Sequence, residues 1–212
     1  MWQAACLNRS VACFLFSKML LSPLLFIHDH EVISQVSDKG LVIVFTGDGK
    51  GKTTAALGLA LRAAGHKMYV SIVQFVKSNV PTGEVQAIER LVPEVEIVTL
   101  GRGFVSCWGD RTPLEEHHSA AAEALALARQ RILSGSWDVV ILDEINTAVA
   151  LGLIDVLDVI SLIEAKPAKL HLLLTGRSAH PDVIAAADLV TEMRNIKHPY
   201  DSGVSARKGI DF

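Results

Sequence analysis

The sequence predicts an α/β fold in which a mostly parallel sheet is covered by helices on both faces. Two observations lead to this prediction: short continuous apolar runs alternate with longer helix-forming segments, and the apolar runs are rich in β-branched residues. Strands that are buried on both faces of a parallel sheet have this pattern, and the helices between them form the crossovers. The chain has 212 residues, enough for one such domain, and its net charge of -3 provides no basic excess for a nucleic-acid partner.

Each expected element follows from a local signal. The run LVIVFT predicts a first strand at 41–46, and the helix-forming segment after the glycine-rich loop ends at Gly65, a typical C-cap. Pro113, followed by two glutamates, predicts the start of a long alanine-rich helix that continues to about Gly135. The other strands are expected at 68–76, 95–100, 137–144, 170–176 and 188–193, and the other helices at 83–91, 155–165 and 180–187. A polar loop is expected at 101–112, and a tail of little periodicity at 197–212.

The stretch TGDGKGKTT predicts a phosphate-binding loop between the first strand and the first helix. The full motif is a glycine, four residues and then Gly-Lys-Ser/Thr; the second half matches, whereas the first glycine position falls on Thr46 with Gly47 beside it. Backbone N–H groups of such a loop and the helix N-terminus favour an anion. The predicted nucleotide-binding residues are Thr46, Gly47, Asp48, Gly49, Lys50, Gly51, Lys52, Thr53 and Thr54, with Lys52 between phosphates and the Thr53 hydroxyl on Mg²⁺.

The run WDVVILDE supplies the acidic partner of this loop. Four apolar residues end at Asp143 and Glu144, so two carboxylates are expected at the carboxyl end of a central strand, beside the loop. Carboxylate and hydroxyl oxygens suit Mg²⁺, and the predicted metal ligands are Thr53, Asp143 and Glu144, directly or through water. The predicted fold class is therefore a P-loop NTPase of the RecA-like type. The reaction stays open at this point, because such loops also hold phosphates while chemistry takes place elsewhere on the nucleotide.

Four segments of the chain carry a family resemblance: GLVIVFTGDGKGKTTAALGLALRAAGH, WDVVILDEIN, LLLTGR and ADLVTEMRNIKHPYDSGVSARKGIDF. Together they resemble the ATP:corrinoid adenosyltransferase family of the cobalamin pathway, over about Gly40–Phe212. The resemblance implies an enzyme that transfers the 5′-deoxyadenosyl group of ATP to the Co(I) centre of a reduced corrinoid and releases triphosphate. ATP is then the co-substrate, Mg²⁺ (or Mn²⁺) the cofactor, and no phosphoryl group moves.

The resemblance also implies what the charged residues do. The site has to neutralise the charge that builds on the leaving triphosphate and to place C5′ over cobalt, without a general base. Lys50 and Lys52, with Mg²⁺ on Thr53 and Glu144, suit this task. Arg177, in LLLTGR, is expected to clamp a phosphate. Lys52 and Glu144 are accordingly predicted catalytic residues.

The aromatic residues of the loop after the third strand are the further predicted catalytic residues. The family has a Gly-x-Gly-Phe-Thr-Trp segment whose aromatics occupy the lower face of the corrin, which eases reduction of cobalt. This chain reads GRGFVSCWGD. Phe104 matches, whereas Trp108 follows it by four residues where the family pattern has two, so Trp108 reaches the same place through a longer loop or the lower face is closed differently.

Residues 1–39 are predicted to be an extension ahead of a domain at 40–212. The apolar run Met19–Ile27 is too short to span a bilayer, and no small-x-small cleavage site follows it. Three interpretations stay open: a translated or loosely docked extension, a helix that packs on this domain or on a partner subunit, and an export or organelle address, which is the least favoured because ATP is needed. The three cysteines lack metal-ligand spacing and suit a reducing cytosol, so a cytoplasmic protein with no membrane partner is expected.

Two other functions stay open. The first is a P-loop ATPase or small-molecule kinase, which would yield ADP with phosphate or with a phosphorylated substrate. The second is a non-catalytic, ATP-gated corrinoid carrier, which the altered aromatic loop keeps open. The resemblance implies a homodimer, with a flavoprotein reductant as a further partner. The sequence does not decide whether the substrate is complete cobalamin or an earlier corrinoid such as the a,c-diamide.

Overall fold

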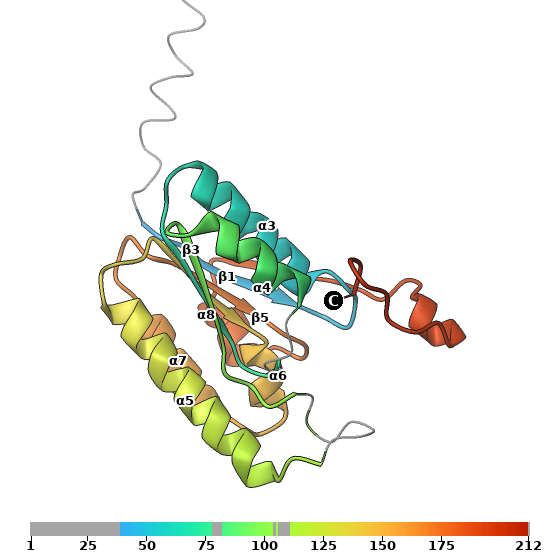
Figure 1. Ribbon diagram of the computed structural model, residues 1–212. Helices are drawn as coiled ribbons and strands as arrows, with labels where there is room; N and C mark the ends of the chain where they lie inside the picture. The colour runs from blue at the N-terminus through green and yellow to red at the C-terminus, as the bar shows by residue number, and fades with distance from the viewer. Residues whose placement is uncertain (1–38, 78–81, 104, 106–110, 212) are drawn as a thin grey trace, which may run out of the picture. The chain divides into compact units, whose positions relative to one another are not determined.

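The computed structural model describes residues 39–77, 82–103, 105 and 111–211. Its centre is a six-stranded sheet with the order β3-β2-β4-β5-β1-β6, in which every neighbouring pair is parallel (Figure 1). Each strand lies within the range that the sequence predicts, so the parallel α/β sheet is confirmed. The strands are β1 (Val42–Thr46), β2 (Val70–Gln74), β3 (Val95–Thr99), β4 (Val139–Asp143), β5 (His171–Thr175) and β6 (Leu189–Glu192).

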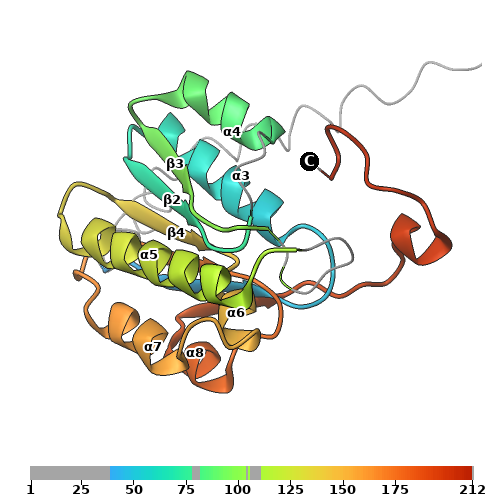
Figure 2. The ribbon, with the colours of Figure 1, turned by 60° about the horizontal axis from the view of Figure 1, so that its bottom comes forward.

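Helices cover both faces of this sheet, as Figure 2 shows. On one face lie α3 (Lys52–Gly65) and α4 (Gly83–Ile88), and on the other α5 (Leu114–Leu133), α6 (Ile145–Ala150), α7 (Val156–Glu164) and α8 (Pro181–Ala186). Two short 3-10 helices are η1 (Glu89–Leu91), which continues α4, and η2 (Pro199–Ser202) in the tail. The sequence does not predict α6, because six residues directly after a strand are too few to show a helical period.

Each face of the sheet has its own apolar core, because successive strand residues point to opposite faces. Val44 packs in the core under α5 to α8, and its neighbour Ile43 packs in the core under α3. The helices that cover the centre of the sheet present small side chains to it, so they approach the strands closely. These buried alanines are Ala56, Ala60 and Ala63 in α3 and Ala121, Ala124 and Ala128 in α5.

The carboxyl ends of all six strands lie along one edge of the sheet, as parallel pairing requires. Ligands of open parallel sheets bind at this edge. Strand β5 lies between β1 and β4, so one strand separates the phosphate loop after β1 from the carboxylates that end β4. In the part of the chain that the structure describes, no helix has the length and apolar character needed to cross a membrane.

Candidate functional site

The phosphate loop joins β1 to α3, and Lys52 is the first residue of the helix. The Lys52 side chain folds back into the loop, where Nζ donates to Gly47 O at 2.6 Å and to Gly49 O at 2.8 Å. Only 6% of Lys52 is exposed. Burial lowers the pKa of Lys52; the Glu144 carboxylate opposes this shift and the Arg177 guanidinium adds to it. The loop therefore encloses a desolvated amine, and an anion that enters the loop would stabilise its charged form.

The glycines of the loop pack against the chain that follows β6. Gly49 N donates to Met193 O at 2.6 Å, and Met193 N donates to Thr46 O at 2.8 Å. A Cβ on Gly47 would lie 2.4 Å from Met193 O, and a Cβ on Gly49 would lie 2.7 Å from Arg194 O. Gly47 also has a φ of +94°, which favours glycine. The sequence assigns these glycines to phosphate approach, and the structure adds this packing as a second reason for them.

Asp143 is the centre of a buried hydrogen-bond network at the carboxyl edge, and it is 1% exposed. Its Oδ1 accepts from Thr53 Oγ1 at 2.9 Å and from Thr175 Oγ1 at 2.7 Å. Its Oδ2 accepts from Gln74 Nε2 at 3.0 Å and lies 3.4 Å from Lys77 Nζ. Four donors thus occupy the acceptor positions of one carboxylate. Asp143 is held in a single orientation, and its contact with Thr53 joins β4 to the phosphate loop.

Further polar residues extend this network to the neighbouring elements. Thr99 Oγ1 in β3 donates to Gln74 Oε1 at 2.7 Å, and Lys77 Nζ pairs with Glu84 Oε1 in α4 at 2.9 Å. Burial opposes the charge of Lys77, but the Asp143 and Glu84 carboxylates outweigh it and raise the pKa of Lys77. No sequence motif singles out these residues. Their position in the sequence could have indicated them, because Gln74 and Lys77, like Asp143, lie at or just after the end of a buried strand.

Glu144 turns the chain from β4 into α6 in a left-handed backbone conformation, with φ 65° and ψ 20°. A non-glycine residue in this region costs about 1–3 kcal/mol, and such strain persists where the surroundings hold it. Here Glu144 N donates to Thr175 Oγ1 at 2.9 Å, and Glu144 Oε2 accepts from Thr147 Oγ1. Thr147 Oγ1 in turn accepts from Arg177 N at 2.9 Å. The structure therefore brings Glu144 and the start of the Arg177 segment together beside the phosphate loop.

The other predicted loop residues have different surroundings. Thr46 Oγ1 accepts from Ala179 N at 3.1 Å, which ties the loop to the segment after β5. Asp48, Lys50 and Thr54 are exposed. Lys50 Nζ forms an ion pair with Asp211 Oδ1 at 2.7 Å, so a residue of the C-terminal tail reaches the loop. No local sequence pattern predicts this contact.

Phe104 and Trp108 lie outside the described residues, so their places at the lower face of the corrin stay a prediction. The residues that flank Phe104 are described. Gly103 N donates to Val76 O at 3.0 Å, and Val105 packs against the core under α5 to α8. The bond to Val76 lies just beyond the end of β2, at the same edge of the sheet as the phosphate loop.

The oxygen donors of the site fit a hard divalent cation. Thr53 and Asp143 are joined directly, and Thr175 joins Asp143 to the backbone of Glu144. Glu144 is partly exposed, and its Oε1 accepts no hydrogen bond from the described residues. Mg²⁺ binds through one or two carboxylates together with substrate phosphates and water. The chemistry of these side chains therefore suits Mg²⁺ that arrives with a nucleotide.

Comparison with known proteins identifies similar chains over nearly the whole described region. Residues 38–212 match the family model for ATP:corrinoid adenosyltransferase BtuR/CobO/CobP. A corrinoid adenosyltransferase of Sinorhizobium sp. is 42% identical over 181 residues, which cover 84% of this chain and 83% of that protein. Corrinoid adenosyltransferase CobA of Salmonella typhimurium is 40% identical over 185 residues. A corrinoid adenosyltransferase of Escherichia coli K12 is 38% identical over 184 residues. Each of these two alignments covers 87% of this chain and 91% of the relative.

Proposed function

Since the chain belongs to the ATP:corrinoid adenosyltransferase family, we propose that the site at the carboxyl edge of its sheet holds ATP for adenosyl transfer. The enzyme transfers the 5′-deoxyadenosyl group of ATP to the Co(I) centre of a corrinoid, and triphosphate is the other product. The observation that carries this conclusion is the family match over residues 38–212, which includes the phosphate loop, the carboxylates after β4 and the tail.

The reaction sets a simple demand on the protein. The electron pair of Co(I) forms a bond to C5′ of the ribose, the bond from C5′ to the triphosphate oxygen breaks, and its electron pair leaves with the triphosphate. No proton has to be removed, so no general base is needed. The cations around the loop, Lys50, Lys52 and Arg177, stabilise the charge that develops on the leaving group. Holding the phosphates in a rigid loop also places C5′ for attack.

We assign Mg²⁺ (or Mn²⁺) to Thr53 and Glu144. When bound, the ion supplies positive charge against the triphosphate. Asp143 lies behind Thr53, and its four hydrogen-bond donors suit it to orienting that hydroxyl or to contacting the ion through water. Glu144 is the better direct ligand because it is partly exposed and one of its oxygens has no donor among the described residues.

The corrinoid is assigned to the loop that contains Phe104 and Trp108. Phe104, and Trp108 if the longer spacing permits, would exclude a lower axial ligand from cobalt, and the resulting site would ease reduction to Co(I). The described neighbour Gly103 supports this assignment, because its bond to Val76 anchors the start of the loop just beyond β2, at the edge of the sheet where we place ATP. A homodimer, a flavoprotein reductant and a cytoplasmic location are further proposals that rest on the family resemblance and the composition.

One experiment tests the proposed function. Purified protein is mixed with ATP, Mg²⁺ and chemically reduced corrinoid, and the absorbance is followed as the corrinoid converts to its adenosylated form. Ion chromatography of the same mixture should show one triphosphate for each adenosylated corrinoid. ADP with phosphate in its place would indicate an ATPase or kinase, and binding of adenosylated corrinoid without turnover would indicate a carrier. Parallel assays with cobalamin and with the a,c-diamide corrinoid identify the preferred substrate.

A further inference from the structure

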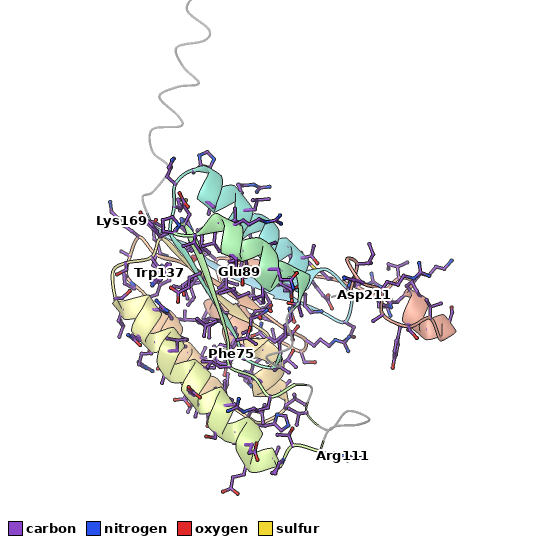
Figure 3. All side chains as sticks on the ribbon, viewed as in Figure 1. Phe75, Glu89, Arg111, Trp137, Lys169 and Asp211 are labelled. Atoms are coloured by element: carbon purple, nitrogen blue, oxygen red, sulfur yellow. The ribbon has the colours of Figure 1, made fainter. Side chains whose placement is uncertain are left out.

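The C-terminal tail returns to the phosphate loop. The 3-10 helix η2 stands away from the sheet in two views, and the chain after it folds back toward the loop that follows β1 (Figures 1 and 2). Figure 3 labels Asp211 where the returning chain reaches this loop. Residues 207–211 form a turn in which Asp211 N donates to Arg207 O at 2.8 Å. The turn thus presents an acidic side chain to a loop that is far away in the sequence.

Both oxygens of that side chain are engaged. Asp211 Oδ1 lies 2.7 Å from Lys50 Nζ, and Oδ2 accepts from Arg207 N at 2.8 Å. The Lys50 ammonium, followed by the Arg207 N–H, lowers the pKa of Asp211, so the carboxylate is charged at neutral pH. The Asp211 carboxylate therefore pairs with a lysine that the proposed function assigns to triphosphate.

We propose that Asp211 is a positioning residue for Lys50: it holds the Lys50 side chain before ATP binds, competes with the triphosphate for that side chain, and moves off the loop with its turn when the triphosphate occupies the site. This inference rests on the proposed function, because that function places triphosphate at Lys50. Re-formation of the pair then assists release of the triphosphate product.

The energetics of the contact suit a reversible exchange. The side chains of Lys50 and Asp211 are 40% and 22% exposed, so the pair is screened by solvent and is easily broken. Triphosphate carries several negative charges and repels a carboxylate that stays at the same ammonium. The two anions therefore exclude each other at Lys50.

The tail can make this movement without leaving the domain. The segment between β6 and the tail is fixed to the base of the loop through Met193, which bonds to Gly49 and to Thr46. Between Met193 and the turn, η2 stands away from the sheet, so the turn meets the loop as a separate contact (Figures 1 and 2). Release of Asp211 therefore breaks this contact and leaves the packing at Met193 in place.

Calorimetric titration with inorganic triphosphate at low salt and without Mg²⁺ tests the competition. Asp211→Asn should bind triphosphate more tightly, by up to about fivefold, because the competing charge is gone. Asp201→Asn is the matched control: it removes one negative charge from the same tail, and Asp201 pairs with Asn195 rather than with the loop. In a Lys50→Met background, Asp211→Asn should add nothing further.

Limited proteolysis tests the movement. Trypsin cleaves after Arg207 and Lys208, within the turn, and mass spectrometry identifies the released C-terminal peptide. Triphosphate should accelerate this cleavage in the wild-type protein. In Asp211→Asn the cleavage should be rapid from the start, and triphosphate should not accelerate it further.

The outcomes separate this inference from the proposed function. Absence of triphosphate and ATP binding to the wild-type protein would overturn the proposed function and this inference with it. If the wild-type protein binds triphosphate but Asp211→Asn binds it no more tightly than Asp201→Asn, only the role of Asp211 is overturned. The same holds if triphosphate does not change the rate at which trypsin cleaves the turn. Tighter binding that persists in the Lys50→Met background would show that Asp211 acts by general charge, and this also overturns its pairing role.

Discussion

At the residue scale, Lys52 is the side chain most enclosed by the phosphate loop. It is buried, and its ammonium contacts two carbonyls of the loop. Lys52→Ala should lower the rate of adenosyl transfer by about a hundredfold or more, because it removes a preorganised positive charge from the leaving triphosphate. The rate is measured with chemically prepared Co(I) corrinoid, so that reduction does not limit it.

The control for Lys52→Ala is Arg62→Ala, which removes one positive charge from the exposed far end of the same helix. Arg62→Ala should retain the wild-type rate, and both variants should unfold near the wild-type temperature. A rate for Lys52→Ala within threefold of wild type would contradict the assignment of the loop to triphosphate.

Gly49 provides a second prediction at this scale. A Cβ at this position would lie 2.7 Å from backbone atoms of Met193 and Arg194, which cannot yield as a flexible side chain would. Gly49→Ala should therefore destabilise the fold by about 1–3 kcal/mol and weaken ATP binding. Thermal unfolding and calorimetric titration measure the two effects.

The matched control is Gly58→Ala, in the interior of α3, where an added Cβ would meet no atom of the described residues within 4 Å apart from those of its own helix. It should stabilise the protein by about 0.5–1 kcal/mol, because alanine loses less backbone entropy than glycine in a helix. Equal unfolding temperatures for the two variants would show that the tail does not constrain the loop at Gly49.

At the element scale, the network around Asp143 holds the ends of neighbouring strands together. Lys77, just after β2, pairs with Asp143 at the end of β4 and with Glu84 in α4. Lys77→Met should destabilise the fold by about 1–3 kcal/mol, because the buried Asp143 carboxylate loses a charged donor. Urea denaturation at neutral pH measures the loss.

Lys77→Arg is the companion variant, since it retains the charge and the donors. It should recover much of the stability that Lys77→Met loses, as judged by the same urea denaturation. Equal destabilisation of Lys77→Met and Lys77→Arg would show that a positive charge at this position does not by itself stabilise the network.

At the scale of the whole molecule, stability in acid depends on how the edge strand is tied to the sheet. Asp188, directly before β6, accepts from Val42 N in β1 at 2.8 Å and lies 3.6 Å from Lys39 Nζ. The backbone hydrogen bond from Val42, followed by the charge of Lys39, lowers the pKa of Asp188. A carboxyl whose pKa is lower in the folded state contributes stability above its unfolded pKa of about 3.9. That contribution is lost as the pH falls through the folded value.

Asp188→Asn should therefore reduce the free energy of unfolding at pH 7 and leave it nearly unchanged at pH 2. The measurement is urea denaturation across this range, in which the variant should show a shallower acid limb than wild type. Glu123→Gln, which removes an exposed acid from the interior of α5, serves as the control and should follow the wild-type curve. Parallel curves for Asp188→Asn and wild type would show that Asp188 does not contribute to the acid limb.

The sequence by itself determined the features that depend on local patterns. Continuous apolar runs are typical of strands buried on both faces, and they placed the central strands β1, β2, β4 and β5. The phosphate loop was indicated by Gly51, Lys52 and Thr53, which follow one strand. Its acidic partner was indicated by Asp143 and Glu144, which follow another. In each case the physical cause, a buried strand followed by a turn into a helix, lies within a few neighbouring residues.

Only the tertiary structure decided which distant residues share the site. Gln74, Lys77 and Thr175 are ordinary strand-end residues in the sequence, and they matter because β2, β4 and β5 are neighbours in the sheet. The contact of Asp211 with Lys50 joins residues that are far apart in the sequence, and no local sequence pattern predicts such a pair. The physical reason is that strand order and the return of the tail depend on the packing of the whole chain, whereas motifs and periods depend on near neighbours.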